Sequence, residues 1–338
     1  MSRAVDLDGD GHLELIVVNG ENGVTSELDS YIYWGGPGGL TGERLEIPTA
    51  GAYDVATVDL TGNGLLDIIL PSAWVDHHNA GKPLPIQVLE QVEPRKFVDA
   101  TQRHGLTGIA GVSIVCEDVT GNGWPDLVVA NYRTGFEYDT DSYIYVGKEG
   151  GFETTPLRLP THYALQVVLG DLDADGDQDL LVGAVGLLFF ENKGNDDSDP
   201  SGLLIPRFEL LKSLEITDSY SLSAADIDLD HDLDLYICRY RAAQESFPTP
   251  YHDAQNGPPN ILLKNNGDWN FIDATDEFGL NTNNNKYSFA ASWTDIDSDG
   301  DPDLYVANDF GRNNLYRNDG GHFTDAAAEL GVEDISAG

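Results

Sequence analysis

Residues 171–185 read DLDADGDQDLLVGAV, an acidic loop that runs directly into an apolar segment. The loop has Asp at positions 1, 3, 5 and 9 and Gly at position 6. Similar nine-residue loops, with Asp, Asn, Thr or Glu at the oxygen-bearing positions, begin at Asp6, Asp59, Asp118, Asp226 and Asp295. Successive loops lie between 53 residues (Asp6 to Asp59) and 69 residues (Asp226 to Asp295) apart. This recurrence predicts six tandem repeats of one structural unit.

Each repeat contains four short segments with β-strand character. An apolar segment precedes the loop, and a β-rich one, such as LVVANY at 127–132, follows it. A third reads SYIYWG at 30–35, and a weaker fourth reads FVDATQ at 97–102 and FTDAAA at 323–328. A strand, a tight loop and a strand form a hairpin, so the unit is predicted to be a four-stranded antiparallel meander. Such repeats, without helical periodicity, predict a single all-β domain over residues 1–338, a β-propeller with six evident blades.

The acidic loops have the ligand chemistry of a calcium site. Calcium takes about six to eight oxygen ligands, and a loop with oxygen side chains at alternate positions can wrap around it. The EF-hand is excluded because it needs Glu at position 12, where these loops have Val, Leu or Ile. Acidic turns that merely face water are the alternative, but six copies in the same phase argue against it. The predicted ligands are Asp6, Asp8, Asp10 and Glu14; Asp59, Thr61, Asn63 and Asp67; Asp118, Thr120, Asn122 and Asp126; Asp171, Asp173, Asp175 and Asp179; Asp226, Asp228, Asp230 and Asp234; and Asp295, Asp297, Asp299 and Asp303.

The six loops differ in charge. Loops one, four, five and six have four carboxylates each at the ligand positions, whereas loops two and three have two carboxylates with Thr and Asn. Fewer charges weaken calcium binding, so occupancy of the six sites is expected to differ. Loop five has His231 in place of Gly, so the sharp bend expected at position 6 is less favoured there. Every ligand position of loop five is nevertheless filled. Because calcium would cross-link carboxylates that otherwise repel one another, folding and calcium binding are predicted to be coupled.

Composition limits the classes of partner. The 338 residues contain 58 Asp and Glu against 18 Lys and Arg, a net charge of −40, which disfavours nucleic acids and anionic membranes as partners.

Cys116 and Cys238 lie in strand-like segments and are expected to be buried free thiols. No apolar stretch is long enough to span a membrane, and no signal peptide is evident. The last residues, GVEDISAG at 331–338, stand where the next repeat is expected, which favours a fragment with an incomplete seven-blade ring over a closed six-blade ring.

The repeats resemble the FG-GAP or VCBS repeats of integrin α-subunit propellers, and the resemblance covers essentially the whole chain. More narrowly, NGPPNILLKNNGDWNFIDATDEFGL at 256–280 and ANDFGRNNLYRNDGGHFTDAAAELGV at 307–332 are similar to the ASPIC/UnbV and cartilage-acidic-protein-like group. The resemblance implies a calcium-stabilised propeller, commonly of seven blades, that acts in adhesion or ligand binding and is secreted or displayed on the cell surface. The C-terminal module of the ASPIC/UnbV group is absent from this sequence.

A ligand surface is predicted opposite the calcium loops. In an up-and-down blade the second turn emerges on the face opposite the first, and these second turns are long and rich in aromatic and basic residues. Such residues are common at binding hot spots, although they can equally cap the blade ends. The candidate ligand-binding residues are Trp74, His77, Tyr132, Arg133, Tyr240, Arg241, Tyr251, Phe310 and Arg312.

Three functions remain open from the sequence. The first is a non-catalytic extracellular recognition or adhesion module for a protein or carbohydrate, since loops of modest calcium affinity stay filled where calcium is abundant. The second is a calcium-dependent polysaccharide-degrading enzyme, which would need a convergent acid and base. The third is a purely structural module of a larger surface protein. We expect the first, because no catalytic motif appears. Oligomeric state is not indicated.

Overall fold

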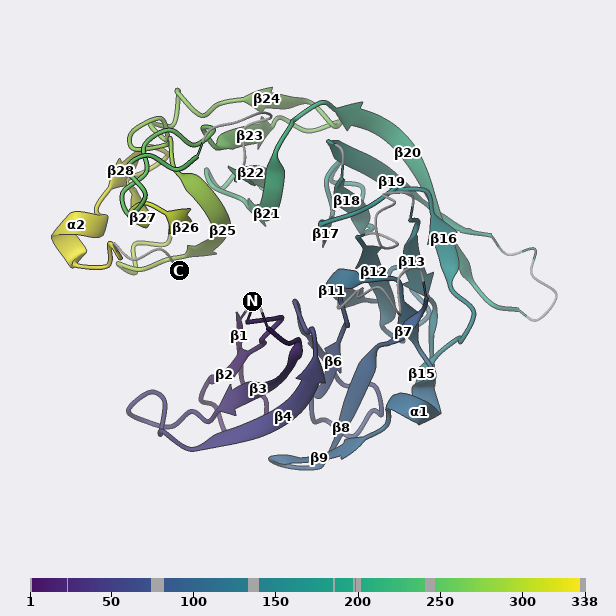
Figure 1. Cartoon of the computed structure of the whole chain (residues 1–338). Helices are drawn as coiled ribbons and strands as arrows, with labels where there is room; N and C mark the ends of the chain where they lie inside the picture. Colours follow the sequence, from purple (N-terminus) through teal and green to yellow (C-terminus); the bar gives the residue numbers. More distant parts are fainter. Residues whose placement is uncertain are drawn as a thin grey trace. The chain divides into compact units, whose positions relative to one another are not determined.

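The structure is a computed structural model (Figure 1), which describes residues 2–22, 24–73, 82–132, 140–184, 186–196, 198, 202–240 and 247–334. The chain divides into two compact units. Unit 1 comprises residues 1–167 and 193–208, and unit 2 comprises residues 168–192 and 209–338. The prediction of one domain over the whole chain stays a prediction.

The prediction of an all-β propeller fold is confirmed, with six four-stranded antiparallel blades among the described residues. In every blade the strands are neighbours in chain order, as a meander requires. The blades are β1 (Ser2–Val5), β2 (Glu14–Val17), β3 (Glu27–Tyr33) and β4 (Arg44–Ala50); β5 (Ala56–Val58), β6 (Asp67–Leu70), β8 (Gln87–Glu93) and β9 (Lys96–Asp99); β11 (Gly111–Glu117), β12 (Asp126–Asn131), β13 (Ser142–Tyr145) and β16 (Leu157–Leu159); β17 (Gln166–Gly170), β18 (Asp179–Gly183), β19 (Leu187–Asp196) and β20 (Ile205–Leu214); β21 (Ser219–Ala225), β22 (Asp234–Arg239), β23 (Ile261–Asn265) and β24 (Phe271–Asp273); and β25 (Tyr287–Thr294), β26 (Asp303–Phe310), β27 (Asn314–Asn318) and β28 (Phe323–Asp325). Two short ribbons, β7 (Leu84–Pro85) with β10 (Thr107–Gly108) and β14 (Gly147–Lys148) with β15 (Gly151–Phe152), complete the sheets.

Two one-turn helices are present, although the sequence shows no helical periodicity. α1 (Thr101–His104) and α2 (Ala327–Leu330) follow the fourth strands β9 and β28. In each case an Asp at the strand end, Asp99 or Asp325, accepts a hydrogen bond from the first backbone N–H of the helix. A glycine in the left-handed conformation then ends the turn. One turn is too short for hydrophobic periodicity to reveal it.

The hydrophobic cores lie between neighbouring blades. In unit 1 the first strands β5 and β11 pack together, and Ile69 and Val88 join Leu127 and Val129 in one buried cluster. In unit 2 the first strands β21 and β25 pack together, and a second cluster joins β22 to β26. Because a single blade is too thin to bury both of its faces, apolar area is removed from water only when blades stack.

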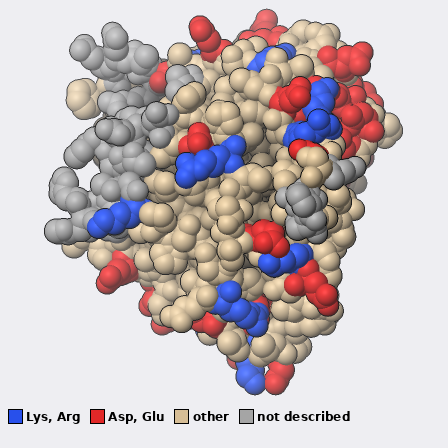
Figure 2. Space-filling view, turned by 90° about the vertical axis from the view of Figure 1, so that its right-hand side faces the viewer, with Lys and Arg blue, Asp and Glu red and all other residues tan. Residues whose placement is uncertain are grey.

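Both cysteines are free, as expected; Cys238 is buried, whereas Cys116 is only half-buried, so its predicted full burial is wrong. Among the described residues, no helix is long and apolar enough to cross a membrane. Figure 2 shows one face on which the Lys and Arg side chains of the described residues are scattered, several of them directly beside Asp or Glu side chains.

Candidate metal-binding loops and second-turn surface

The acidic residue at position 9 holds each loop to its own blade. In loop two, the buried Asp67 accepts one hydrogen bond from the backbone N–H of Leu60 (2.9 Å) and another from that of Gln91 (2.7 Å). The first N–H lies in the loop, and the second lies in the third strand. Glu14, Asp126, Asp179, Asp234 and Asp303 make corresponding pairs of contacts in the other five loops, with the second N–H just after the third strand in loops one and three. Position 9 is therefore a structural residue of the blade as well as a predicted ligand.

The Asp at position 1 organises the loop backbone. In loop two, Asp59 accepts hydrogen bonds from the N–H groups of Gly62, Asn63 and Gly64. The residue at position 6 has positive φ in all six loops, for example +84° at Gly64 and +78° at His231. Position 4 also has positive φ, a constraint that we did not predict and that Ala174, Leu229 and Ser298 meet without glycine. Loop five therefore forms the same bend as the other loops, although its position 6 is His231 and not glycine.

Replacing His231 with glycine should stabilise the protein. A non-glycine residue in the left-handed region costs about 1–2 kcal/mol of conformational strain. Glycine avoids this strain but loses more backbone entropy on folding, so the net gain is smaller than the strain. The His231 side chain is 95% exposed, so its removal loses little packing. We expect His231→Gly to raise the free energy of unfolding by about 1 kcal/mol in urea denaturation. The reciprocal change Gly176→His, at φ +97° in loop four, should lower it by a similar amount. A destabilised His231→Gly variant would contradict this account.

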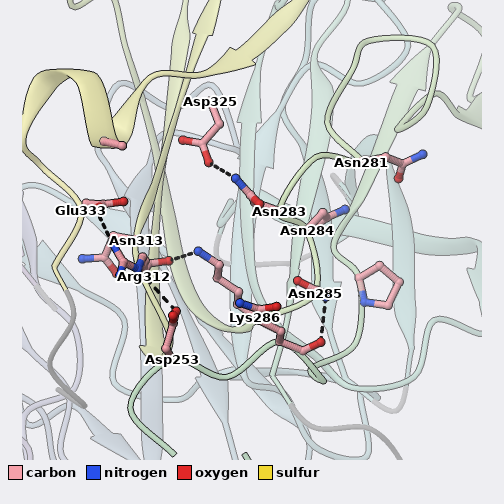
Figure 3. A pocket seen from close by; sticks show the side chains of 13 residues that line it. Asp253, Asn281, Asn283, Asn284, Asn285, Lys286, Arg312, Asn313, Asp325 and Glu333 are labelled. Atoms are coloured by element: carbon pink, nitrogen blue, oxygen red, sulfur yellow. Dashed lines mark hydrogen bonds and ion pairs between the residues drawn. The ribbon is translucent and has the colours of Figure 1, made fainter. Parts of the chain in front are cut away.

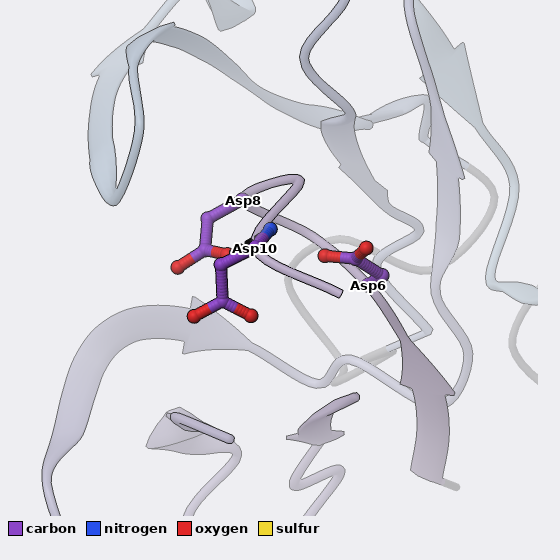
Figure 4. A group of neighbouring side chains, drawn as sticks. All are labelled: Asp6, Asp8 and Asp10. Atoms are coloured by element: carbon purple, nitrogen blue, oxygen red, sulfur yellow. Dashed lines mark hydrogen bonds between the residues drawn. The ribbon is translucent and has the colours of Figure 1, made fainter. Parts of the chain in front are cut away.

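Four of the loops bring carboxylate oxygens within 4.8 Å of one another among the described residues. They are loops one, four, five and six, the four in which the sequence places four carboxylates. The groups are Asp6, Asp8 and Asp10; Asp171, Asp173 and Asp179; Asp226, Asp228 and Asp230; and Asp295, Asp297 and Asp299. In loop one, the Asp6 carboxylate is directed toward Asp8 and Asp10 (Figure 4). Only oxygen donors are present, which suits a hard cation such as calcium.

In loop four, neighbouring carboxylates repel one another and one buried carboxylate oxygen has no hydrogen-bond partner. Asp177, at position 7, has a buried Oδ1 atom without a hydrogen-bond partner. Burial, reinforced by Asp175, Asp173 and Asp171, raises the pKa of Asp177 to about 6. Burial also raises the pKa of Asp179 to about 7, against the lowering effect of its two backbone hydrogen bonds. A cation held by Asp171, Asp173 and Asp179 would relieve this repulsion. These three residues therefore fit a metal ion, and Asp177 lies outside the converging group.

In loops one and five, a basic side chain already lies against the carboxylates. Arg95, from the turn between β8 and β9, contacts Asp8 and lies 3.1 Å from Asp10. Lys264, on β23, contacts Asp228 and lies 2.9 Å from Asp230. The side chain of Lys264 is only 16% exposed. These cations neutralise part of the charge that a metal ion would otherwise neutralise, and the sequence pattern did not reveal them.

Loops two and three are closed by amides instead of charge. Asn63 donates a hydrogen bond from its side chain to the backbone carbonyl of Gln91 (2.8 Å), and Asn122 donates to that of Gly147 (2.9 Å). Each bond joins position 5 of the loop to the blade, at Gln91 in the third strand β8 and at Gly147 just after the third strand β13. A carboxylate cannot donate such a bond. A neutral amide therefore ties each of these two loops to its blade.

The structure describes five of the nine predicted ligand-binding residues. Trp74, His77, Arg133 and Arg241 lie outside the described residues. Tyr132 packs edge-on against Tyr163, at 6.0 Å between ring centroids. Tyr240, Tyr251 and Phe310 belong to a chain of rings in unit 2 that we call the aromatic ladder. Its members are Tyr220, Phe289, Tyr240, Tyr287, Phe310, Tyr251 and His252, with successive centroids 4.7 to 6.1 Å apart.

Arg312 lines a cavity of about 510 Å³ in unit 2, which we call the second-turn cavity (Figure 3). Its wall comes from the second turn after β22, including Asp253 and Gln255, and from the second turn after β26, including Arg312. The segment Asn281–Lys286, which leads into β25, supplies further amides, and Asp325 and Glu333 also line the cavity. The sequence pointed to the two turns but missed the segment before β25, since a run of asparagines there reads simply as a loop.

The comparisons with known proteins agree with this repeat architecture. The family model described as FG-GAP-like repeat matches residues 6–70, 118–182 and 295–337, which together make up just over half of the chain. The chain belongs to the FG-GAP-like repeat family. Each matched stretch begins at position 1 of an acidic loop, at Asp6, Asp118 or Asp295. The search of curated proteins found no match.

Two solved structures are similar to this FG-GAP-like repeat protein at low identity. The V. cholerae biofilm matrix protein Bap1 is 18% identical, with a TM-score of 0.39, over 79% of this chain and 37% of that one. The chain thus spans well under half of the length of Bap1. BBS1N, solved in complex with ARL6DN, is 11% identical, with a TM-score of 0.46, over 96% of this chain and 89% of that one.

Proposed function

We propose that this FG-GAP-like repeat protein is a calcium-binding, non-catalytic extracellular recognition module. The observation that carries the proposal is loop four, where the carboxylates of Asp171, Asp173 and Asp179 converge. A divalent cation there cancels the repulsion between these acids. Such loops of modest affinity stay filled where calcium is abundant, which supports action outside the cell. Recognition is supported by the family resemblance and by the polar cavity and aromatic ladder of unit 2.

Counting bound calcium tests this proposal. We expect equilibrium dialysis to find about four ions per chain, one for each charged loop, because loops two and three lack a carboxylate triad. The double variant Asp297→Asn with Asp299→Asn removes two exposed acids of loop six and should lower the count by one. The matched change Asn63→Ala in loop two should leave the count unchanged. A chain that takes up no calcium would overturn the proposal.

Lys264 should compete with calcium at loop five. Its ammonium group must leave Asp228 and Asp230 before a metal ion can occupy the loop. A partly buried ion pair of this kind is worth about 1 kcal/mol, so Lys264→Met should tighten calcium binding at loop five about fivefold. Titration calorimetry of the variant checks this. Lys148→Met, which removes a surface pair with Glu153 outside the loops, is the control and should bind as the unaltered protein does.

A further inference from the structure

The second-turn cavity is lined by polar groups whose charges are already matched. Arg312 pairs with Glu333 and lies 3.6 Å from Asp253. Lys286 is 7% exposed, and its Nζ atom donates to the backbone carbonyl of Arg312 at 2.7 Å. Three carboxylates and two cations thus leave the wall close to neutral. Arg312 is held by carboxylates, Lys286 donates to a backbone carbonyl, and Asp325 accepts hydrogen bonds from Asn283 and Asn314.

Amide side chains supply much of the remaining surface. Asn283 donates to Asp325 at 2.8 Å, and Asn285 donates to the backbone carbonyl of Gln255 at 2.7 Å. These bonds fix the orientation of each amide and leave the carbonyl oxygens of Asn283 and Asn285 to accept. Gln255 is exposed at the rim. An amide both donates and accepts hydrogen bonds, as a ligand hydroxyl does, so fixed amides match a hydroxyl-rich neutral molecule.

The backbone around the cavity is closely packed, which holds these groups in place. A side chain on Gly257 would meet the carbonyl oxygen of Lys286 at 2.1 Å, and one on Gly311 would meet that of Ala254 at 2.9 Å. Gly311 also has φ +120°, a region that L residues rarely adopt. The two second turns and the segment before β25 are therefore in direct backbone contact. A preformed wall of this kind loses little entropy when a ligand binds.

Three segments of the aromatic ladder are adjacent in sequence to residues that line the cavity. His252 precedes Asp253, Phe310 lies two residues before Arg312, and Tyr287 follows Lys286. Tyr251 is 57% exposed, and its ring packs against both His252 and Phe310. An exposed ring held edge-on by its neighbours is a rigid surface for the apolar face of a ligand. Tyr251 stands two residues from Asp253 of the cavity wall.

We propose that the second-turn cavity and Tyr251 form a binding site for a neutral saccharide. The amides bind its hydroxyl groups, and the Tyr251 ring packs on the C–H face of a sugar ring. The cavity volume of about 510 Å³ lies within the range of about 300–1,000 Å³ for small-molecule sites. A sulfated or carboxylated glycan is disfavoured, because Arg312 is paired with Glu333, Lys286 is buried against a backbone carbonyl and the chain carries a net charge of −40. This inference rests on the proposed recognition function and names its class of ligand.

An array of immobilised neutral, sialylated and sulfated oligosaccharides, probed with the full chain in calcium-containing buffer, tests the proposal. We expect neutral members to bind. Titration calorimetry with the neutral oligosaccharide that binds best then compares variants. Tyr251→Ala should weaken binding about tenfold. Gln255→Ala, at the exposed rim, should weaken it about fivefold.

The control is Tyr53→Ala, which removes a partly exposed ring of unit 1 and should leave the affinity within about twofold. Thermal unfolding of every variant establishes that it is folded. Preference for sulfated glycans, or neutral binding that survives both Tyr251→Ala and Gln255→Ala, would overturn the saccharide site. Absence of glycan binding by a protein that still takes up about four calcium ions would overturn it too, while leaving the calcium part of the proposed function intact.

Discussion

Removing calcium should lower the melting temperature of this protein by at least about 10 °C. At 1 mM calcium, a site with a dissociation constant of about 10 µM stabilises the folded chain by about 2.7 kcal/mol. Up to four loops would each add such a contribution. In excess chelator the clustered carboxylates repel one another without compensation, most strongly in loop four, where burial raises the pKa of Asp179 to about 7. Scanning calorimetry with calcium and with chelator measures the difference.

A potassium chloride control separates binding from screening. Salt at matched ionic strength screens carboxylate repulsion without filling a site, so it should restore only a small part of the lost stability. The double variant Asp171→Asn with Asp173→Asn removes two of the three converging acids of loop four and should shrink the calcium response by about one quarter. Equal stabilisation by potassium chloride and by calcium would rule out site-specific binding as the cause.

Asp67→Ala should destabilise the protein by about 3–5 kcal/mol whether or not calcium is present. Asp67 is fully buried, and its carboxylate accepts hydrogen bonds from the backbone N–H groups of Leu60 and Gln91. Alanine leaves both N–H groups buried without a partner. Loop two lacks a carboxylate triad, so the loss belongs to the blade itself. Urea denaturation with calcium and with chelator gives both values.

Asp319→Ala is the matched control for this loss. Its carboxylate is half exposed and pairs only with the neighbouring Arg317 among the contacts described, so the change should cost less than about 0.5 kcal/mol. If Asp67→Ala were destabilising in calcium alone, position 9 would act through the metal, and its structural role would be refuted. We expect the two urea curves of the variant to shift by the same amount.

Much of the fold follows from local patterns in the chain. The phase of the acidic loops placed the first hairpin of every blade, because a tight loop with glycine at position 6 forces the chain to reverse. Runs such as LVVAN and ILLKN identified the second and third strands, because strands buried on both faces are continuously apolar. The short helices α1 and α2 were missed, because a single turn is set by one Asp, which accepts from the first helical N–H, and by one glycine that ends the turn.

The chain by itself determined the repeat, the all-β blades and the oxygen-rich chemistry of the loops, since all three depend on residues that are neighbours in sequence. Only the tertiary structure decided which charges meet. It brought Arg95 to Asp8 and Lys264 to Asp228, left Asp177 with an orphaned oxygen, and gathered Asn283, Arg312 and Asp325 around one cavity. Such contacts join residues on separate strands and turns. Their partners depend on how blades and turns pack, which spacing along the chain does not specify.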